Sequence, residues 1–409
     1  GSSNSSTQGP VTSSSSLAPL SNHPSLTMCL SSIDDAKSTH IIDGQRYDLS
    51  KFEHPGGRLF LRLSEGLDIT RVVHSNHLDW EIKHVHLIKK FRVGDAGVAS
   101  DQTMVDPEYL GMKRVVKSLL QKHESAIRRN HMILFVLLLF AHLVYLLPFV
   151  FQFLGRPLSF SVWICYFFST VIFGSQGHEE VHQNHGMGYT LTLAGFMSQD
   201  WMMTHTLVHH PDTNEDTDAE LDLMTFVRNM PFPSVIKSIL ASVYVGVACY
   251  VKVPFYSIFL SIDMRMNLMD KWALTFLWLQ GVAVLVHGGL VGLACLLLCR
   301  TCSGLWFLAN DVANHFYYEP KSLATPRSGR WHLDQIAYSQ DVIITGNPLL
   351  DNVLSFSLSN QSLHHLHPRL LNAEVAAIRT DYWKIMEKAL GLTPNETSWT
   401  TAIVNLMCW

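Results

Sequence analysis

Two uncharged runs, separated by a single arginine, constrain this chain more than any other feature. Residues 132–155 contain no Asp, Glu, Lys or Arg, and after Arg156 residues 157–177 are uncharged again. A helix of about 20 apolar residues crosses the roughly 30 Å hydrocarbon core of a bilayer. Because so short a connection forces two such helices to run antiparallel, we predict a membrane hairpin. Charged residues make up only 16% of the chain, against roughly 25% in soluble domains, which agrees with a part that lies in lipid.

Two further apolar regions, residues 238–262 and 272–299, predict a second hairpin. The first of them contains a lysine and a proline, so an interfacial helix is the alternative there. Basic residues gather before the first uncharged run, whereas the tip of the first hairpin carries only Arg156, and this asymmetry places the N-terminal part in the cytosol. Two hairpins return the chain to its starting side. We therefore expect a mainly α fold with a four-helix transmembrane bundle and cytosolic regions before and after it.

The first hundred residues divide into two regions of different composition. Residues 1–36 are rich in serine and contain no sustained apolar run, so they cannot bury enough surface to offset the entropy of ordering. We expect a disordered tail there, followed over 38–96 by a small soluble domain. The formal net charge of −4 excludes a protein that binds nucleic acid by charge.

Histidine is unusually frequent, with 22 in the chain, and the small domain holds a pattern suited to haem. A haem iron held by two histidines needs imidazoles on opposite faces of the ring. Glycines beside one of them let the backbone approach the macrocycle closely. His54, followed by Pro-Gly-Gly, has this context, and His74 and His77 are the candidates for the second ligand.

This stretch resembles the cytochrome b5 domain, a small α+β fold, on its His-Pro-Gly-Gly quartet and a histidine somewhat over twenty residues later. In b5 domains fused to lipid desaturases an Asp-x-Thr turn precedes the distal histidine by nine positions. Asp68 and Thr70 then favour His77 over His74, so the resemblance implies haem b between the quartet's histidine and His77. Val73 stands where that family usually has an aromatic residue packed on the haem, which predicts an altered haem affinity or potential.

Three histidine clusters lie outside the small domain, each where the predicted topology puts it on the cytosolic side of a span. They are His178, His182 and His185; His205, His209 and His210; and Gln361, His364 and His365. A single histidine is usually a satisfied core or surface residue. Pairs that recur three times at membrane boundaries instead predict joint metal ligation.

The donor set indicates which metal. Eight or more imidazoles with almost no cysteine disfavour a structural zinc site, which needs four ligands. Two iron ions fit better, because neutral nitrogen donors leave an iron pair with high net charge and open positions for O₂. Soluble di-iron bundles instead use glutamates. Such a centre can activate O₂ for attack on an unactivated C–H bond.

The three clusters resemble the histidine boxes of the membrane fatty acid desaturase and hydroxylase superfamily, and the similarity spans roughly residues 105–390. Gln361 at the start of the third box, together with an N-terminal b5 domain, is similar to the front-end acyl desaturases and the related sphingoid-base desaturases. The second box has one residue more between its histidines than their common form, which would rotate His205 relative to the pair. The resemblance also implies that His315 binds iron and that Asn310 or Asp311 contacts the metal through water.

An acidic run follows the second box. It contains Asp212, Glu215, Asp216, Asp218, Glu220 and Asp222. We expect a solvated loop, and the alternative is a segment that positions an arginine or an electron donor. Beyond the desaturase-like region, residues 391–409 are expected to form a C-terminal tail.

The resemblance implies a membrane-bound, O₂-dependent oxidoreductase that introduces a cis double bond into an acyl chain carried on CoA, phospholipid or a sphingoid base. Electrons from NADH or NADPH would pass through cytochrome b5 reductase to the haem and then to the two non-haem irons. The expected location is the endoplasmic reticulum, with both metal sites facing the cytosol, and a homo-oligomer is left open. The alternative is a lipid or sterol hydroxylase on the same di-iron scaffold, and a third reading is a b5 electron donor with decayed boxes.

Overall fold

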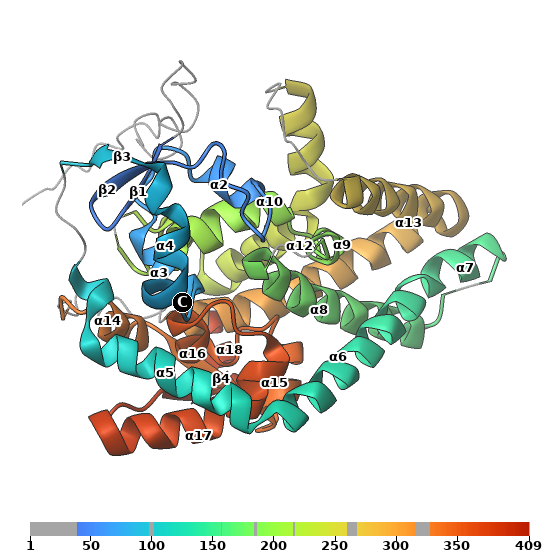
Figure 1. Ribbon diagram of the computed structural model, residues 1–409. Helices are drawn as coiled ribbons and strands as arrows, with labels where there is room; N and C mark the ends of the chain where they lie inside the picture. Colours follow the sequence, from blue (N-terminus) through green and yellow to red (C-terminus); the bar gives the residue numbers. More distant parts are fainter. Residues whose placement is uncertain are drawn as a thin grey trace, which may run out of the picture. The chain divides into compact units, whose positions relative to one another are not determined.

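The computed structural model in Figure 1 covers the small N-terminal unit, the apolar helices and the histidine clusters. It describes residues 39–97, 102–156, 158–183, 186–215, 217–259, 268–315 and 328–408. Residues 1–36, for which we predict a disordered tail, lie outside this described part.

The small unit combines a three-stranded antiparallel sheet with short helices. Its elements are β1 (Thr39–Ile42), β2 (Gln45–Asp48), α2 (Leu59–Leu63), α3 (Thr70–Asn76), η2 (Trp80–His84), α4 (Val85–Ile88), η3 (Lys89–Phe91) and β3 (Arg92–Asp95). Asp43 and Gly44 join β1 to β2 with φ values of 52° and 72°, the left-handed pair that a two-residue hairpin needs. The hydrophobic core of the unit also includes Leu207, which lies between His205 and His209 of the second histidine cluster.

The first long hairpin follows a short connection, η4 (Gln102–Val105). It consists of α5 (Pro107–Lys122), α6 (Glu124–Tyr145), α7 (Leu147–Phe153) and α8 (Phe160–Gln183). Asp106 caps α5 by accepting a hydrogen bond from the Glu108 N–H at 2.8 Å, and Pro107 begins the helix. Pro148, which cannot continue the backbone ladder, separates α7 from α6. The α6 and α8 helices pack together, as expected for a hairpin. The ring of Tyr145 stacks on that of Tyr166, with the two ring centroids 4.8 Å apart.

The second hairpin differs from the one expected from the sequence. The α13 element (Leu268–Asn314) contains two helical arms joined at Gly289, whose φ of 62° favours glycine. Gln280 on one arm accepts a hydrogen bond from the Tyr166 hydroxyl through Oε1 at 2.9 Å, and Arg300 on the other arm lies over the Tyr166 ring. The chain therefore turns back inside the uncharged run 272–299, which a count of charges does not reveal.

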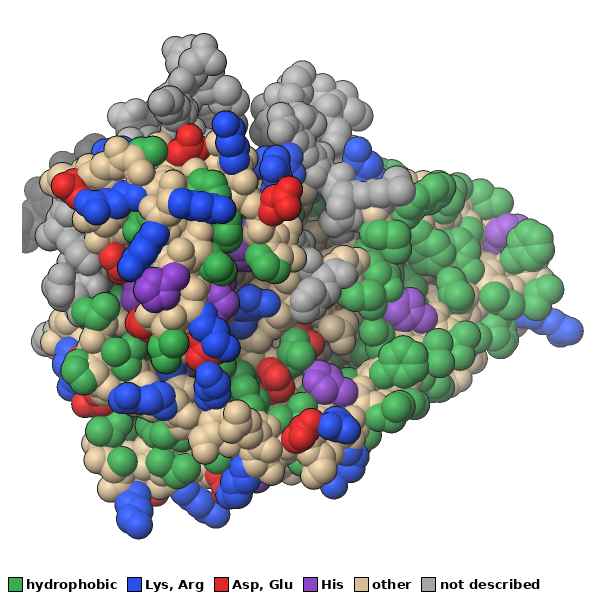
Figure 2. All heavy atoms as spheres, viewed as in Figure 1, with side chains coloured by type: hydrophobic (Ala, Val, Ile, Leu, Met, Phe, Trp, Pro, Cys, Tyr) green, Lys and Arg blue, Asp and Glu red, His purple; other side chains and the backbone are tan. Residues whose placement is uncertain are grey.

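The described part of the region 238–262, predicted as the partner of that run, belongs to a separate helix instead, and residues 260–262 lie outside the described residues. This helix is α12 (Ser234–Phe259), which packs along α13 (Figure 1). Among the described residues, two segments are long and apolar enough to cross a membrane, Glu124–Phe153 and Lys271–Asn314. Figure 2 shows apolar side chains crowded over this helical region, whereas charged side chains gather over the rest of the same face.

The remaining elements surround the histidine clusters. They are α9 (Tyr189–Ala194), α10 (Ser198–Trp201), η5 (Met202–His209), α11 (Ala219–Arg228), α14 (Trp331–Ala337), β4 (Gln340–Ile343), α15 (Pro348–Leu354), α16 (Gln361–Leu366), α17 (Asn372–Leu390), β5 (Asn395–Ser398) and α18 (Trp399–Cys408). The segment that we expect to be a C-terminal tail thus contains β5, paired in parallel with β4, and α18, packed on α13. Its Trp399 ring lies 4.6 Å from that of Trp306.

Candidate metal centre and haem pocket

Eight buried histidines form two adjoining sets. The larger set is His178 and His182 of α8, His205 of η5, His210 directly after it, and His364 of α16. The smaller set is His209, His315 and His365. Within each set, one ring nitrogen of every residue lies within 4.8 Å of the others. Clusters that are far apart in the sequence therefore meet in space, as the topology predicts.

Local backbone geometry explains how each cluster reaches these sets. On α8, His178 and His182 are four residues apart and share one face. The η5 element is a π-helix, in which the His210 N–H donates to the His205 carbonyl oxygen at 3.0 Å. This wider turn absorbs the extra residue of the second box, which would rotate His205 away from its pair on an α-helix.

The hydrogen bonds of the rings in the larger set orient them toward a shared cation. Nδ1 of His178 donates to the Phe356 carbonyl oxygen at 2.8 Å, and Nδ1 of His205 donates to the Glu220 carboxylate at 2.6 Å. Each ring therefore turns a lone pair on Nε2 inward, and these two Nε2 atoms are 2.7 Å apart. Two facing lone pairs repel unless a cation lies between them. Neighbouring ligands about 2.1 Å from one metal ion are themselves about 3 Å apart, which matches this spacing.

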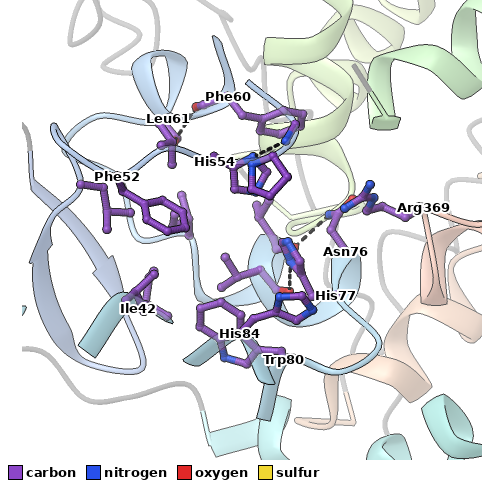
Figure 3. Close-up of a pocket in the computed structure, with 18 of the residues that line it drawn as sticks. Ile42, Phe52, His54, Phe60, Leu61, Asn76, His77, Trp80, His84 and Arg369 are labelled. Carbon is purple, nitrogen blue, oxygen red and sulfur yellow. Dashed lines mark hydrogen bonds between the residues drawn. The ribbon is translucent and has the colours of Figure 1, made fainter. Parts of the chain in front are cut away.

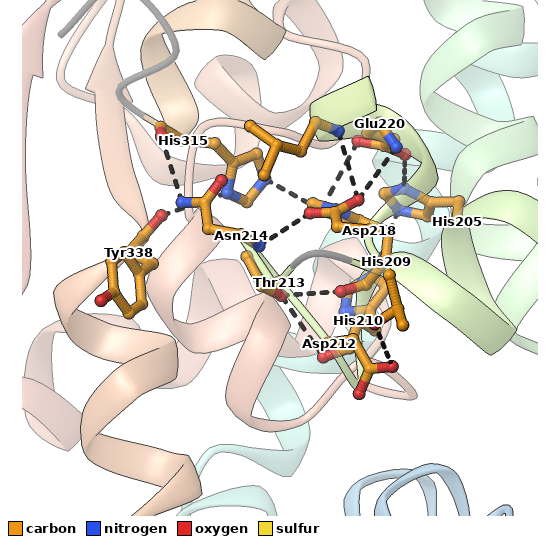
Figure 4. A network of polar contacts seen from close by, with 12 residues as sticks. His205, His209, His210, Asp212, Thr213, Asn214, Asp218, Glu220, His315 and Tyr338 are labelled. Atoms are coloured by element: carbon orange, nitrogen blue, oxygen red, sulfur yellow. Dashed lines mark hydrogen bonds and ion pairs between the residues drawn. The ribbon is translucent and has the colours of Figure 1, made fainter. Parts of the chain in front are cut away.

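The smaller set repeats the arrangement (Figure 4). Nδ1 of His209 donates to the Asp218 carboxylate at 3.0 Å, and Nδ1 of His315 donates to the Tyr338 carbonyl oxygen at 3.2 Å. Their Nε2 atoms are 3.1 Å apart. In each set, two rings thus turn Nε2 inward while Nδ1 is already engaged, the usual organisation of metal-binding histidines.

Two of these outer partners come from the acidic run, and our sequence reasoning missed them. Asp218 and Glu220 are buried beside the histidines, so this part of the run is not the solvated loop that we expected. Asp218 also caps α11, and an Asp that precedes a helix is the one signal that the sequence offers. Asp212 and Glu215 instead pair with Arg71 of the small unit, at 2.8 and 2.9 Å, which agrees with the alternative that the run positions an arginine.

Burial sets the protonation of the rings. It holds the pKa values of most rings outside α8 well below the usual value, so the neutral form that binds metal predominates at neutral pH. These rings are His205, His210, His315, His364 and His365. For His209 burial also lowers the pKa, but the charges of Asp218 and Glu220 outweigh it and raise the pKa to about 9.

Three residues were predicted as further ligands. The side-chain nitrogen of Gln361 lies 2.9 Å from Nε2 of His315 and 3.0 Å from Nε2 of His365, so this amide touches the smaller set. Asp311 is buried, and its charge acts on His209. His185 lies outside the described residues.

A second candidate site lies in the small unit. The ring centroids of His54 and His77 are 6.0 Å apart, and the planes of the two rings are perpendicular. Two imidazoles that each bind one iron at about 2 Å have ring centres about 6 Å apart, so the spacing suits a haem iron between them. Nδ1 of His77 donates to the Val73 carbonyl oxygen at 2.9 Å, which leaves Nε2 for a metal. A Cβ on Gly56 would lie 3.0 Å from the His54 ring, so a larger residue at position 56 would crowd this imidazole and glycine avoids the contact.

The competing histidine is engaged elsewhere. His74 is buried, with its two ring nitrogens 2.8 Å from the Asp43 carboxylate and 3.0 Å from that of Glu81. It does not line the cavity that His54 and His77 share. The cavity is mostly apolar, as a porphyrin requires.

Four residues of the larger part complete the wall of this cavity (Figure 3). They are His182, Gln183, Leu207 and Arg369. His182 is thus shared between the cavity and the larger histidine set. Ion pairs on another side join the same two parts, Lys113 to Glu81 at 2.9 Å and Lys117 to Asp79 at 2.8 Å.

Comparison with known proteins agrees with both sites. The chain matches the family model for the cytochrome b5-like haem/steroid binding domain over residues 30–97 and that for fatty acid desaturase over residues 157–393. It is 23% identical over 381 residues to the Delta(5) fatty acid desaturase A of Dictyostelium discoideum, with 80% of each chain covered. It is 27% identical over 201 residues to the Acyl-lipid (7-3)-desaturase of Diacronema lutheri, covering 46% of this chain and 44% of that protein. No solved structure matches the chain. The predicted resemblance is confirmed, and the chain belongs to the fatty acid desaturase family and carries an N-terminal cytochrome b5 domain.

Proposed function

We propose that this desaturase uses O₂ to introduce a cis double bond into a lipid acyl chain, at a front-end position. The observation that carries the proposal is the convergence of eight buried imidazoles with inward-facing nitrogens. Two relatives named as a Delta(5) and a (7-3) desaturase support the front-end type, as does Gln361 at the start of the third box.

We further propose that the two histidine sets hold two non-haem irons. His178, His182, His205, His210 and His364 would hold one ion, and His209, His315 and His365, with Gln361 beside them, would hold the other. When bound, an iron pair supplies the power to oxidise an unactivated C–H bond with O₂ and two electrons. The chain's own contribution is to fix the rings: Asp218 and Glu220 hold two of them by Nδ1, and the buried surroundings keep water away.

Electrons enter, in this proposal, through haem b held by His54 and His77. A cytochrome b5 reductase would supply them singly from NADH or NADPH. Arg71, paired with the acidic run, helps to hold the b5 domain against the desaturase domain. His182 borders both sites, so the haem cavity directly adjoins the larger histidine set.

We propose a multi-pass membrane protein in which α6 with α7, α8 and the two arms of α13 form the four crossings. In that arrangement α12 lies at the interface, the alternative that its lysine suggested. Gln152 at the tip of the first hairpin and Gly288 at the tip of the second line one pocket, which supports an arrangement with both tips on the same side. The two metal sites then face the cytosol, and the endoplasmic reticulum is the expected membrane. The proposed domain boundaries are 38–96 and 105–390.

Lipid profiling tests this function. In a host fed polyunsaturated acyl precursors, the chain should yield products two mass units lighter than a precursor, with the new bond on the carboxyl side of an existing one. Replacing both His364 and His365 with Ala should abolish the product, whereas His86→Ala, on the exposed surface of the b5 domain, should not. A product sixteen mass units heavier would show a hydroxylase. Unchanged product formation by the double variant would show that the boxes are not catalytic.

A further inference from the structure

The haem cavity has few charged side chains in its lining, although its proposed ligand is an anion. Haem carries two propionate groups, both ionised at neutral pH. Among the residues that line the cavity there is no Asp or Glu, and Arg369 is the one Lys or Arg. This arginine does not come from the b5 domain but from the desaturase domain, where it follows Pro368 directly, four residues after His365 of the third histidine box.

The position of Arg369 is fixed by its backbone and by one neighbour. Its carbonyl oxygen accepts a hydrogen bond from the Gln183 side chain, and its Nη2 donates back to Gln183 Oε1 at 3.1 Å. Gln183 is the last residue of α8 and also lines the cavity. The guanidinium is thereby held at the cavity wall, beside Asn76 and His77 in Figure 3.

Most of the guanidinium's hydrogen-bonding capacity remains available. A guanidinium has five N–H donors, and within the described parts of the chain the hydrogen bond that this one donates goes to Gln183, not to an Asp or Glu. The nearest acid to act on it is Glu374, whose carboxylate accepts the Leu371 N–H at 2.8 Å and caps α17. A half-buried arginine with unused donors at the wall of an otherwise uncharged cavity is suited to an anion, and its planar fork matches a carboxylate in particular.

We propose that Arg369 binds a propionate of the haem held by His54 and His77, so that the haem is anchored to both domains. The inference rests on the haem binding of the proposed function but not on its substrate. It gives the docked position of the b5 domain a second role: the haem pocket is complete only when the desaturase domain closes it. Haem loading would then favour docking, and docking would slow haem release.

Haem release from the full-length protein tests the proposal. Arg369→Gln removes the charge, and Arg62→Gln, an exposed arginine of the b5 domain that does not line the cavity, is the matched control. Each protein is loaded with haem, and transfer to excess apomyoglobin is followed by absorbance. Because a hydrogen bond to a charged partner is among the stronger ones in proteins, R369Q should release haem about tenfold faster, and R62Q should release it like the unmodified chain.

Haem dimethyl ester separates a propionate contact from a structural role. The ester lacks the carboxylates, so the unmodified chain and R369Q should release it at the same rate. The proposal is overturned if R369Q releases haem as slowly as the unmodified chain, or if it accelerates release of haem and ester equally. Should R369Q not load haem at all, Arg369→Lys serves in its place: it keeps the charge but not the fork, and should accelerate release of haem but not of the ester. The assay needs no substrate, so a failed desaturase assay would not affect it.

Discussion

The carboxylate behind His209 provides a sharp test of how the metal site is built. Asp218 is buried, and both its oxygens lie close to Nδ1 of His209, at 3.0 and 3.1 Å. It also accepts N–H groups of Glu220 and Asn214, at 2.9 and 2.7 Å, which begins α11. Asp218→Asn keeps an oxygen of the same size and a residue that caps helices equally well, but it removes the negative charge.

The expected magnitude follows from what the substitution keeps. The cap survives, but the metal-free protein loses the buried ion pair with His209, whose pKa the Asp218 charge raises, so its stability should fall by about 3 kcal/mol. The ring of His209 loses a charged partner for a neutral one, and such changes behind a metal ligand typically weaken metal binding about 10- to 100-fold. Asp218→Ala should weaken the metal as much and also lose the cap, at a further cost of about 1 kcal/mol.

The assay is titration of metal-depleted full-length protein with Fe²⁺, together with thermal unfolding of the same samples. Asp212→Asn is the matched control, because Asp212 belongs to the same acidic run but pairs with Arg71 at 2.8 Å instead of a histidine. We expect D218N to lose affinity for iron and, without metal, to unfold at a lower temperature, and D212N to bind iron normally. Equal iron affinity in D218N and D212N would refute the role given to the buried carboxylate.

Two further predictions concern stability. A Cβ on Gly304 of α13 would lie 2.3 Å from the Ser242 carbonyl oxygen of α12, whereas a Cβ on Gly281 of α13 would have nothing within 4 Å. Gly304→Ala should therefore lower the free energy of unfolding by about 1–3 kcal/mol, measured by thermal unfolding in detergent, and the control Gly281→Ala should not. Equal stability of the two variants would contradict this packing. For His74, burial lowers the pKa, but hydrogen bonds to Asp43 and Glu81 outweigh it and raise the pKa above 6.5. The stabilisation of the folded b5 domain by protonated His74 is therefore complete below about pH 6.5 and is lost as the pH rises through the folded pKa. In the unmodified protein the melting temperature of the haem domain should decline between pH 6 and 9, and His74→Gln should flatten this decline. An unaltered slope in the variant would speak against this role of His74.

Short-range patterns were enough to single out the candidate site residues. Histidine spacings of four residues or fewer fix which side chains share a helix face, so the three boxes could be recognised without a structure. The quartet after His54 could be recognised for the same reason, because its glycines act on a neighbouring ring. The π-helix of η5 shows the limit: the extra residue was visible, but the backbone that absorbs it was not.

What escaped prediction depends on contacts between distant segments. Asp218 and Glu220 looked like members of a solvated acidic run, because only the folded chain shows which two of its carboxylates turn inward. The reversal at Gly289 lies inside an uncharged run. Such a run looks the same in the sequence whether it forms one long helix or the two arms of a hairpin, because both are apolar throughout. The parallel pairing of β4 with β5 joins residues more than fifty positions apart, and no local pattern near residue 395 indicates it.

The most direct test of the central claim is the ratio of iron to haem in the purified full-length protein. Total iron is measured by elemental mass spectrometry and haem by its pyridine complex in the same sample. If the two histidine sets each hold an iron and the b5 domain holds one haem, the protein should contain two non-haem irons for every haem. A sample fully loaded with haem that contains no iron beyond it would contradict the account.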